Sequence, residues 1–453
     1  MRTIVDGFRD LLHLLADSLR LWWRNLLPLT TWFLAGYVGF RAAIDGAIWL
    51  AEHQHSSLGV GVFSAGVLIQ IATTVGMIRT CASSLYRWRD AAVNKNEETA
   101  DPTQQGLMEL LSVTLLPLVA VWSAWGFLED KVSRLTVSNL VERGTQPGSG
   151  FFVLGGHAWR AYLPAIVILL VLRRVIEAVD DRWPSRPAKF AQVWAEAFFL
   201  LLTVVVVPYA VKDLKGWFRQ RSFWYVSVDW WGGLKDFFGG IHIPIPAGIE
   251  FLWGFFFETL WPLFKLGVGE PLTWLAITTV VFGHRVLSSG GVFRGTRLER
   301  RLGSVQEDPD TPKPNRFVAI TNQAPNLLLG GLREKFYPTL NAFRLLVRVG
   351  PVFLGVVCLG YTLWLLGSDW TYIALQRLIG VHGERWGLMN SEIAEAITNI
   401  FFETLRIALL AAAFDLCISV GAQRLAEAAD ADAAAEADAG AGADPEAATP
   451  ATV

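Results

Sequence analysis

Apolar stretches long enough to cross a lipid bilayer recur along this chain, and they constrain its fold more than any other feature. A bilayer core takes about 20 apolar residues per helix, because every backbone polar group must be satisfied within the segment. Of the 453 residues, 53% are hydrophobic and only 18% are charged. We therefore expect an all-α, polytopic transmembrane helical bundle of about eight spans. The predicted spans are 27–51, 58–79, 106–128, 155–175, 190–211, a long broken stretch within 246–285, 350–367 and 393–417.

Basic residues gather in a few of the loops, and cytoplasmic loops carry the excess of Lys and Arg. The clusters are Arg87, Arg89 and Lys95; Arg173, Arg174, Arg182, Arg186 and Lys189; and Arg285, Arg294, Arg297, Arg300 and Arg301. This pattern predicts a multi-pass protein of the plasma (inner) membrane with both termini in the cytoplasm. The loop 212–245 does not follow the rule, because it carries five basic residues yet lies outside if the number of spans is even.

The same patterns divide the chain into segments. We predict a cytoplasmic interfacial amphipathic helix at 1–25, since Phe8, Leu11, Leu15 and Leu19 recur at helical spacing among charged residues. The remaining predicted segments are hairpin 1 at 26–90, a cytoplasmic linker and hairpin 2 at 91–189, hairpin 3 with a broken helix at 190–287, a cytoplasmic loop and interfacial helix at 288–349, hairpin 4 at 350–424, and a disordered Ala-rich acidic tail at 425–453.

Matched motifs in matched order suggest that these hairpins are internal repeats. In the third hairpin DWWGGLKDFFGGIH (229–242) is followed by FFETL (256–260), and in the fourth DWTYIALQRLIGVH (369–382) is followed by FFETL (401–405). We infer four related hairpins in the same orientation. Repeats of this kind place a shared seam or cavity at the repeat interface. The alternative is a bundle whose middle is filled by side chains.

The two FFETL motifs place the carboxylates of Glu258 and Glu403 in apolar surroundings, where an unpaired charge is costly. Arg406 follows Glu403 by one helical turn, and the simplest interpretation of that copy is an internal ion pair. Trp261 stands at the corresponding place after Glu258. Glu258 is therefore the stronger candidate for a titrating or ligand-facing group. Arg41 and Asp45, four residues apart, are expected to form a structural pair.

An insertion in the third hairpin, LGVGEPLTW (266–274), predicts an interrupted helix in the membrane, because glycine and proline weaken helical hydrogen bonding. Transporters use such breaks, with a nearby carboxylate, to bind substrates or ions. The candidate residues are Gly267, Gly269, Glu270 and Pro271. A harmless kink, or two short helices that re-enter from one side, would give the same pattern.

Five of the seven histidines precede returning helices on the predicted outer face. They are His53, His55, His157, His242 and His382. Converged imidazoles bind metals or sense pH, but no regularly spaced carboxylates accompany them, so we predict no metal site and no cofactor. Tryptophans lie mainly at span ends, as membrane anchors do. Only the loop 217–231 is dense enough in Trp to predict a surface that docks a protein or a lipid.

The sequence favours two functions. The first is a permease-like translocator of a small solute or lipid; the alternative is a non-catalytic scaffold or accessory subunit that binds partners through the Trp-rich loop or the cytoplasmic arms. The expected contacts are with membrane lipids and proteins, since a net charge of −2 gives no general attraction to nucleic acid. An enzyme is not predicted, because nucleotide-binding, zinc-protease and serine-hydrolase motifs are absent. A polar cavity lined by Glu258 and Glu270 would favour transport.

Overall fold

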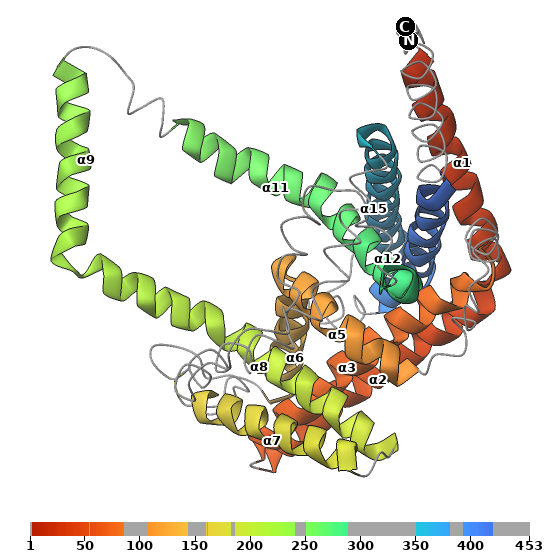
Figure 1. Cartoon of the computed structure of the whole chain (residues 1–453), viewed down its shortest axis with the longest axis horizontal. Coiled ribbons are helices and arrows are strands. Elements are labelled where there is room, and N and C mark those ends of the chain that lie inside the picture. Colours follow the sequence, from red (N-terminus) through yellow and green to blue (C-terminus); the bar gives the residue numbers. More distant parts are fainter. Residues whose placement is uncertain are drawn as a thin grey trace, which may run out of the picture.

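In the computed structural model the described residues are 2–53, 55–85, 107–143, 160, 162–182, 186–240, 251–288, 350–380 and 393–419, and all regular elements in these ranges are helices (Figure 1). Four helices are long and apolar enough to cross a membrane. They are α2 (Leu26–Glu52), α3 (Ser56–Ala82), α8 (Arg186–Arg219) and α15 (Pro351–Ile379). These helices indicate a membrane-associated helical protein, which confirms the predicted class. The count of eight spans is not confirmed.

The other helices surround these four or extend from them. They are α1 (Arg2–Arg24), α5 (Leu107–Ala124), α6 (Phe127–Arg143), α7 (Leu163–Arg182), α9 (Ser222–Gly240), α12 (Glu270–Ser288) and an apolar helix at 393–419 that we call the C-terminal helix. A turn at Gly126, whose φ is +83°, separates α5 from α6. The predicted span at 106–128 therefore ends early, and the charged residues after it form the separate polar helix α6.

Helices α2 and α3 form the closest antiparallel pair, and small residues set their separation. A Cβ atom added at Gly66 would lie 2.5 Å from the Cβ of Ala43 on α2. A Cβ added at Gly36 would lie 2.4 Å from the Thr73 hydroxyl oxygen on α3. Without a hydrophobic force between helices in lipid, close backbone approach of this kind drives their association. This pair corresponds to the predicted hairpin 1.

Helix α1 is amphipathic as predicted, but its apolar residues form two stripes with different surroundings. Leu14 and Leu21 are buried, and Leu14 approaches Gly360 of α15. The indole N–H of Trp22 donates a 2.9 Å hydrogen bond to the Thr404 hydroxyl of the C-terminal helix. The second stripe is exposed and consists of Phe8, Leu12, Leu19 and Trp23. One stripe of α1 therefore packs against α15 and the C-terminal helix, and the other stripe is exposed.

The insertion in the third hairpin does not break its helix. A π-helical segment at Lys265–Gly269 joins a short helix α11 (Trp261–Phe264) to α12, and a second π-helical segment, Phe255–Leu260, precedes α11. Each segment stands shortly before a proline, Pro262 or Pro271. Proline removes one i→i−4 hydrogen bond and crowds that carbonyl. The wider π turns accommodate this loss while the chain remains helical.

Helix α15 is longer than the predicted span 350–367, because it continues to Ile379 and ends at Gly380, whose φ is +85°. The segment from Asp369 is thus a helix extension and not a separate outer element. Glycine is the usual residue where a helix ends in this backbone conformation. The α15 helix packs on the C-terminal helix, where the Trp364 indole donates to the Phe402 carbonyl at 2.6 Å. These two helices correspond to the predicted hairpin 4.

The four-hairpin repeat is not confirmed. Helix α5 packs on α8 and α12, whereas α7 packs on α8, which was assigned to the next hairpin. In Figure 1, α9 and the far half of α8 extend away from the bundle, and α11 returns toward it. The two FFETL copies also differ, since the first is π-helical and exposed and the second is α-helical and packed. The predicted loop 288–349 and the tail 425–453 lie outside the described residues.

Candidate functional site

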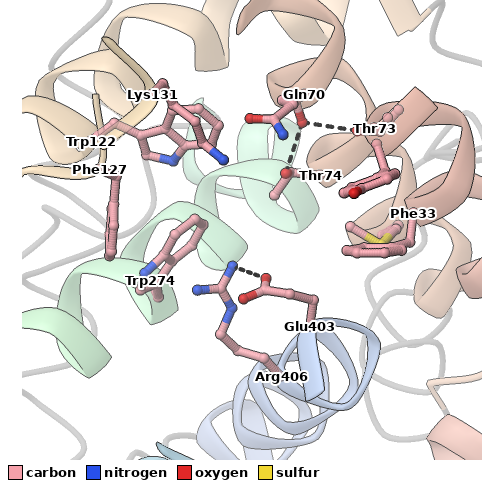
Figure 2. Close-up of a pocket in the computed structure, with 13 residues that line it drawn as sticks. Phe33, Gln70, Thr73, Thr74, Trp122, Phe127, Lys131, Trp274, Glu403 and Arg406 are labelled. Atoms are coloured by element: carbon pink, nitrogen blue, oxygen red, sulfur yellow. Dashed lines mark hydrogen bonds and ion pairs between the residues drawn. The ribbon is translucent and has the colours of Figure 1, made fainter. Parts of the chain in front are cut away.

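A cavity of about 170 Å³ lies where α2, α3, α5, α6, α12 and the C-terminal helix meet (Figure 2). Its walls combine aromatic, hydroxyl, amide and charged side chains. They are Phe33, Gly36, Tyr37, Gln70, Thr73, Thr74, Met77, Trp122, Phe127, Lys131, Trp274, Glu403 and Arg406. A membrane bundle seldom holds so many polar groups together unless they pair with one another or contact a ligand or water.

One side of the cavity is built around Arg406 of the C-terminal helix. Its guanidinium group pairs with the Glu403 carboxylate, with 2.5 Å between Nη2 and Oε2. The guanidinium also lies 4.3 Å from the ring centroid of Trp274 and 5.4 Å from that of Trp364. The predicted pairing of Glu403 with Arg406 is confirmed. Aromatic rings stabilise a buried cation that has left water, so Arg406 is held in place from several sides.

Lys131 of α6 supplies the second cation of the cavity wall. Its ammonium group lies 5.2 Å from the ring centroid of Phe40 and is not ion-paired with any of the described carboxylates. An ion pair between Arg134 and Glu395 holds α6 on the C-terminal helix one turn away. Burial, followed by the charge of Arg134, lowers the pKa of Lys131 to about 8. This lysine thus titrates near physiological pH.

Helix α3 contributes a polar stripe within an otherwise apolar span. The hydroxyls of Thr73 and Thr74 both donate to the backbone carbonyl of Gln70, at 3.0 and 2.9 Å. Both threonines line the cavity, but their hydroxyl protons are already donated to that carbonyl. The side-chain oxygen of Gln70 has no hydrogen-bond partner in the part of the chain that the structure describes. An acceptor is therefore left open on this side.

Several buried polar atoms around the cavity have no partner among the described residues: Gln70 Oε1, Trp122 Nε1, Trp274 Nε1 and Arg406 Nε. Other tryptophans that bridge helices are satisfied; the indole of Trp194 donates to the Gly61 carbonyl, and that of Trp125 donates to the Lys265 carbonyl. Native proteins pair nearly all buried polar groups. A cluster of orphaned groups around one cavity therefore indicates that a ligand or water completes them.

Glu270 of α12 does not line the cavity. The carboxylate is buried, and the Tyr361 hydroxyl of α15 donates a 2.7 Å hydrogen bond to its Oε1 atom. The Tyr361 ring in turn lies 5.0 Å from the Trp364 ring that flanks Arg406. The contact ties α12 to α15 and positions Trp274, which follows Glu270 by one helical turn.

The Tyr361→Phe variant should lose about 1–3 kcal/mol of stability, because the Glu270 carboxylate would keep its burial without its hydrogen-bond donor. Thermal unfolding in detergent, followed by circular dichroism, measures this effect. Tyr225→Phe is the matched control, since Tyr225 of α9 is exposed and its hydroxyl should contribute nothing measurable. Equal unfolding temperatures for Tyr361→Phe and the wild type would contradict a stabilising role for this contact.

The structure does not bring the other predicted site residues together. Glu258 is exposed on a π-helical segment that does not reach the cavity. Gly267 has open space around its Cα, whereas Gly269 lies against the Trp125 ring. Pro271 is in the first turn of α12. The cavity is lined by Glu403, Arg406 and Lys131, and neither Glu258 nor Glu270 lines it.

The predicted histidine cluster falls largely outside the described residues, which omit His157, His242 and His382. His53 is described at the end of α2, where its Nδ1 atom lies 2.8 Å from the Trp49 carbonyl and its ring centroid lies 4.3 Å from that of Trp49, with the two rings tilted by 38°. His55 begins α3. Within the described ranges no group of three or more His, Cys, Asp or Glu side chains is placed to hold a metal ion.

Sequence reasoning missed most of the cavity, although one signal was present. Gln70, Thr73 and Thr74 stand three and four residues apart in the span 58–79, so a helix places them on one face. A polar face in an apolar span points to the bundle interior. No comparable pattern marks Trp122, Lys131 or Trp274, because only tertiary packing brings them to the same place.

Comparison with known protein families, with curated proteins and with solved structures finds no match to this chain.

Proposed function

We propose that this protein is a permease-like translocator and that a small solute binds in the cavity formed by α2, α3, α6, α12 and the C-terminal helix. The proposal uses the topology expected from the sequence: about eight spans, a plasma (inner) membrane location and both termini in the cytoplasm. The observation that supports it is the polar cavity with its orphaned buried groups. Polar groups inside a membrane bundle are costly, and they mark solute and ion pathways.

A packed structural bundle would not need this arrangement. Replacing a buried polar cluster by apolar residues is often neutral or stabilising. Among the described residues, Lys131 has no paired carboxylate, and the indole N–H groups of Trp122 and Trp274 have no acceptor. A bound solute would supply the missing partners of these polar groups.

Thiol labelling tests the proposal without knowledge of the solute. Thr73→Cys is introduced into a background in which Cys81, Cys358 and Cys417 are alanine. The variant is reconstituted in liposomes and exposed to a charged, membrane-impermeant thiol reagent from one side or the other. A translocator opens its site to each side in turn, so we expect labelling from both sides.

Two matched positions on the same helix serve as controls. Ser64→Cys is buried but does not line the cavity, and it should stay unlabelled. Ser83→Cys is exposed at the end of α3 and should be labelled from one side only. If Thr73→Cys is labelled from neither side or from a single side, the translocation proposal fails.

A scaffold or accessory subunit is the second candidate, and the exposed aromatic surface of α8 and α9 favours it. Trp217, Phe223, Trp224, Tyr225 and Trp230 are all exposed there. Aromatic residues are enriched in protein interfaces, and a large exposed apolar patch marks a protein or membrane contact. A cavity that is inaccessible to thiol reagent from both sides would favour this function over transport.

A further inference from the structure

The charges of the cavity wall are unbalanced. Lys131 and Arg406 are cations, and Glu403 is the single carboxylate among the described residues of the wall. Glu403 already pairs with Arg406, and Lys131 forms no direct ion pair with a described carboxylate, so the described wall holds one cation more than it holds carboxylates. A buried charge without a partner is strongly unfavourable unless a ligand or water compensates it. The charge that is missing from this cavity is negative.

The hydrogen-bonding groups around the cavity point to the same ligand class. Three of the four orphaned polar atoms belong to N–H donors: those of Trp122, Trp274 and Arg406. Trp122 and Arg406 are themselves more than nine-tenths buried. Figure 2 shows Trp122 and Lys131 extending from one side toward the Arg406–Glu403 pair on the other. The surplus of donors favours a ligand rich in acceptors, and it disfavours a cation.

The remaining walls are aromatic, and the volume limits the size of the ligand. Phe33, Tyr37 and Phe127 line the cavity beside the two tryptophans. An apolar cavity of about 150 Å³ is large enough to bind benzene. This cavity, of about 170 Å³, therefore has room for one ring and a small polar group.

From these features we infer that the cavity binds a small aromatic carboxylate, a molecule of about the size of benzoate, with the carboxylate beside Lys131 and the ring between the aromatic walls. The inference rests on the proposed function and names the class of its solute. A carboxylate accepts hydrogen bonds from ammonium, guanidinium and indole N–H groups, and such charge-assisted bonds are the strong ones. A free inorganic anion is negatively charged like an aromatic carboxylate, but it has no ring to pack between the aromatic walls.

Equilibrium binding to the full-length protein in nanodiscs tests the inference, with radiolabelled sodium benzoate as the probe and empty nanodiscs as the background. Benzamide has the same ring without the charge, and inorganic phosphate has the charge without the ring. We expect each to compete at least tenfold less well than benzoate. If benzamide competes as well as benzoate, the inference that the cavity recognises a negative charge is wrong. If phosphate competes as well as benzoate, the inference that the cavity recognises an aromatic ring is wrong.

Variants of Lys131 locate the binding site. Lys131→Met should weaken benzoate binding at least tenfold, because the charge-assisted contact is lost. Lys131→Arg should retain binding to within about threefold, because it preserves the charge. Arg377→Met is the matched control, since Arg377 is an exposed cation on α15 that does not line the cavity. If Lys131→Met binds benzoate like the wild type, the assignment is wrong.

The pH profile gives a readout that does not depend on the folding of Lys131→Met. Wild-type affinity should fall about tenfold between pH 7 and pH 9, because Lys131 loses its proton near pH 8 while benzoate stays ionised. The charged groups that act on Lys131 are Asp130 and Arg134 on its own helix and Glu395 and Glu403 on the C-terminal helix. Arg406 and, from α2, the titratable Tyr37 line the same cavity. Lys131→Arg should flatten the profile. A flat wild-type profile would exclude Lys131 as the anion's partner.

The translocation proposal and the ligand proposal can be rejected independently of each other. Benzoate binding is measured at equilibrium, whereas thiol labelling reports access from the two sides of a membrane. Labelling of Thr73→Cys from both sides without benzoate binding would reject the ligand class alone. Benzoate binding with labelling from one side would keep the site and reject translocation.

Discussion

Replacement of Gly66 by leucine should destabilise the protein by about 3 kcal/mol or more, because no space exists for the new side chain between α3 and α2. Even a single Cβ atom would lie 2.5 Å from the Cβ of Ala43 and 3.3 Å from the Cδ2 atom of Phe40. The two helices would have to separate, and the buried contacts along their length would be lost. Gly66→Ala should show a smaller loss of about 1–3 kcal/mol for the same reason.

Gly355 of α15 provides the matched control, since a Cβ atom added there would have no neighbour within 4 Å. Gly355→Ala should leave stability unchanged or raise it by up to about 1 kcal/mol, because alanine is the better helix former. Thermal unfolding of all three variants in the same detergent measures the differences. Similar unfolding temperatures for Gly66→Leu and Gly355→Ala would show that α2 and α3 do not depend on close approach.

Replacement of Arg406 by leucine should cost about 3–5 kcal/mol, because it leaves the Glu403 carboxylate inside the bundle without a counterion. Arg406 is nearly buried, and its guanidinium also contacts the faces of Trp274 and Trp364. The double variant Glu403→Gln, Arg406→Leu should recover part of the loss, since no unpaired charge remains. The size of this recovery gives the part of the stability loss that comes from the unpaired charge, and the remainder comes from lost packing.

The pair formed by Arg41 and Asp45 on α2 gives the comparison at the surface. These side chains are 39% and 54% exposed, and their ion pair is 3.3 Å long. Asp45→Asn should therefore cost less than Arg406→Leu, because the Arg41 guanidinium that remains is not enclosed by protein and can extend its long side chain toward the membrane interface. Unfolding in detergent compares the two pairs directly. Equal losses for Asp45→Asn and Arg406→Leu would contradict the burial that distinguishes them.

Substitutions of Arg406 and Lys131 should differ in their effect on folding. Arg406 holds Glu403, Trp274 and Trp364 together, so its loss would weaken folding and binding at the same time. Lys131 lies on the polar helix α6, and a separate ion pair between Arg134 and Glu395 attaches that helix to the bundle. Substitution of Lys131 therefore removes a charge from the cavity with less effect on the fold.

Local pairs were the part of the site that could be predicted from the sequence. Glu403 and Arg406 stand three residues apart, and Arg41 and Asp45 stand four apart; a helix brings such residues together whatever surrounds it. Glu258 does not line the cavity that Glu403 lines, because the identical FFETL motif lies in a different tertiary environment. The prolines that follow the π-helical segments are present in the sequence, but they do not interrupt the helix as predicted.

Contacts between distant helices could not be predicted. The hydrogen bond from Trp22 to Thr404 joins residues 382 positions apart, and the one from Tyr361 to Glu270 spans 91 positions. Nothing in the local pattern of either partner identifies the other. The same holds for Lys131, whose place beside Phe40 and across from Glu403 depends on how α6 folds back after Gly126.

The sequence by itself determined the helical class, the places of the long apolar helices and the amphipathic character of α1, because the length and period of an apolar stretch fix how its backbone must be satisfied. Only the tertiary structure decided which helices are neighbours and which polar groups share a cavity. The physical reason is that an apolar side chain finds lipid and a neighbouring helix almost equivalent. The hydrophobic pattern therefore specifies each helix, and close packing and buried polar contacts specify the bundle.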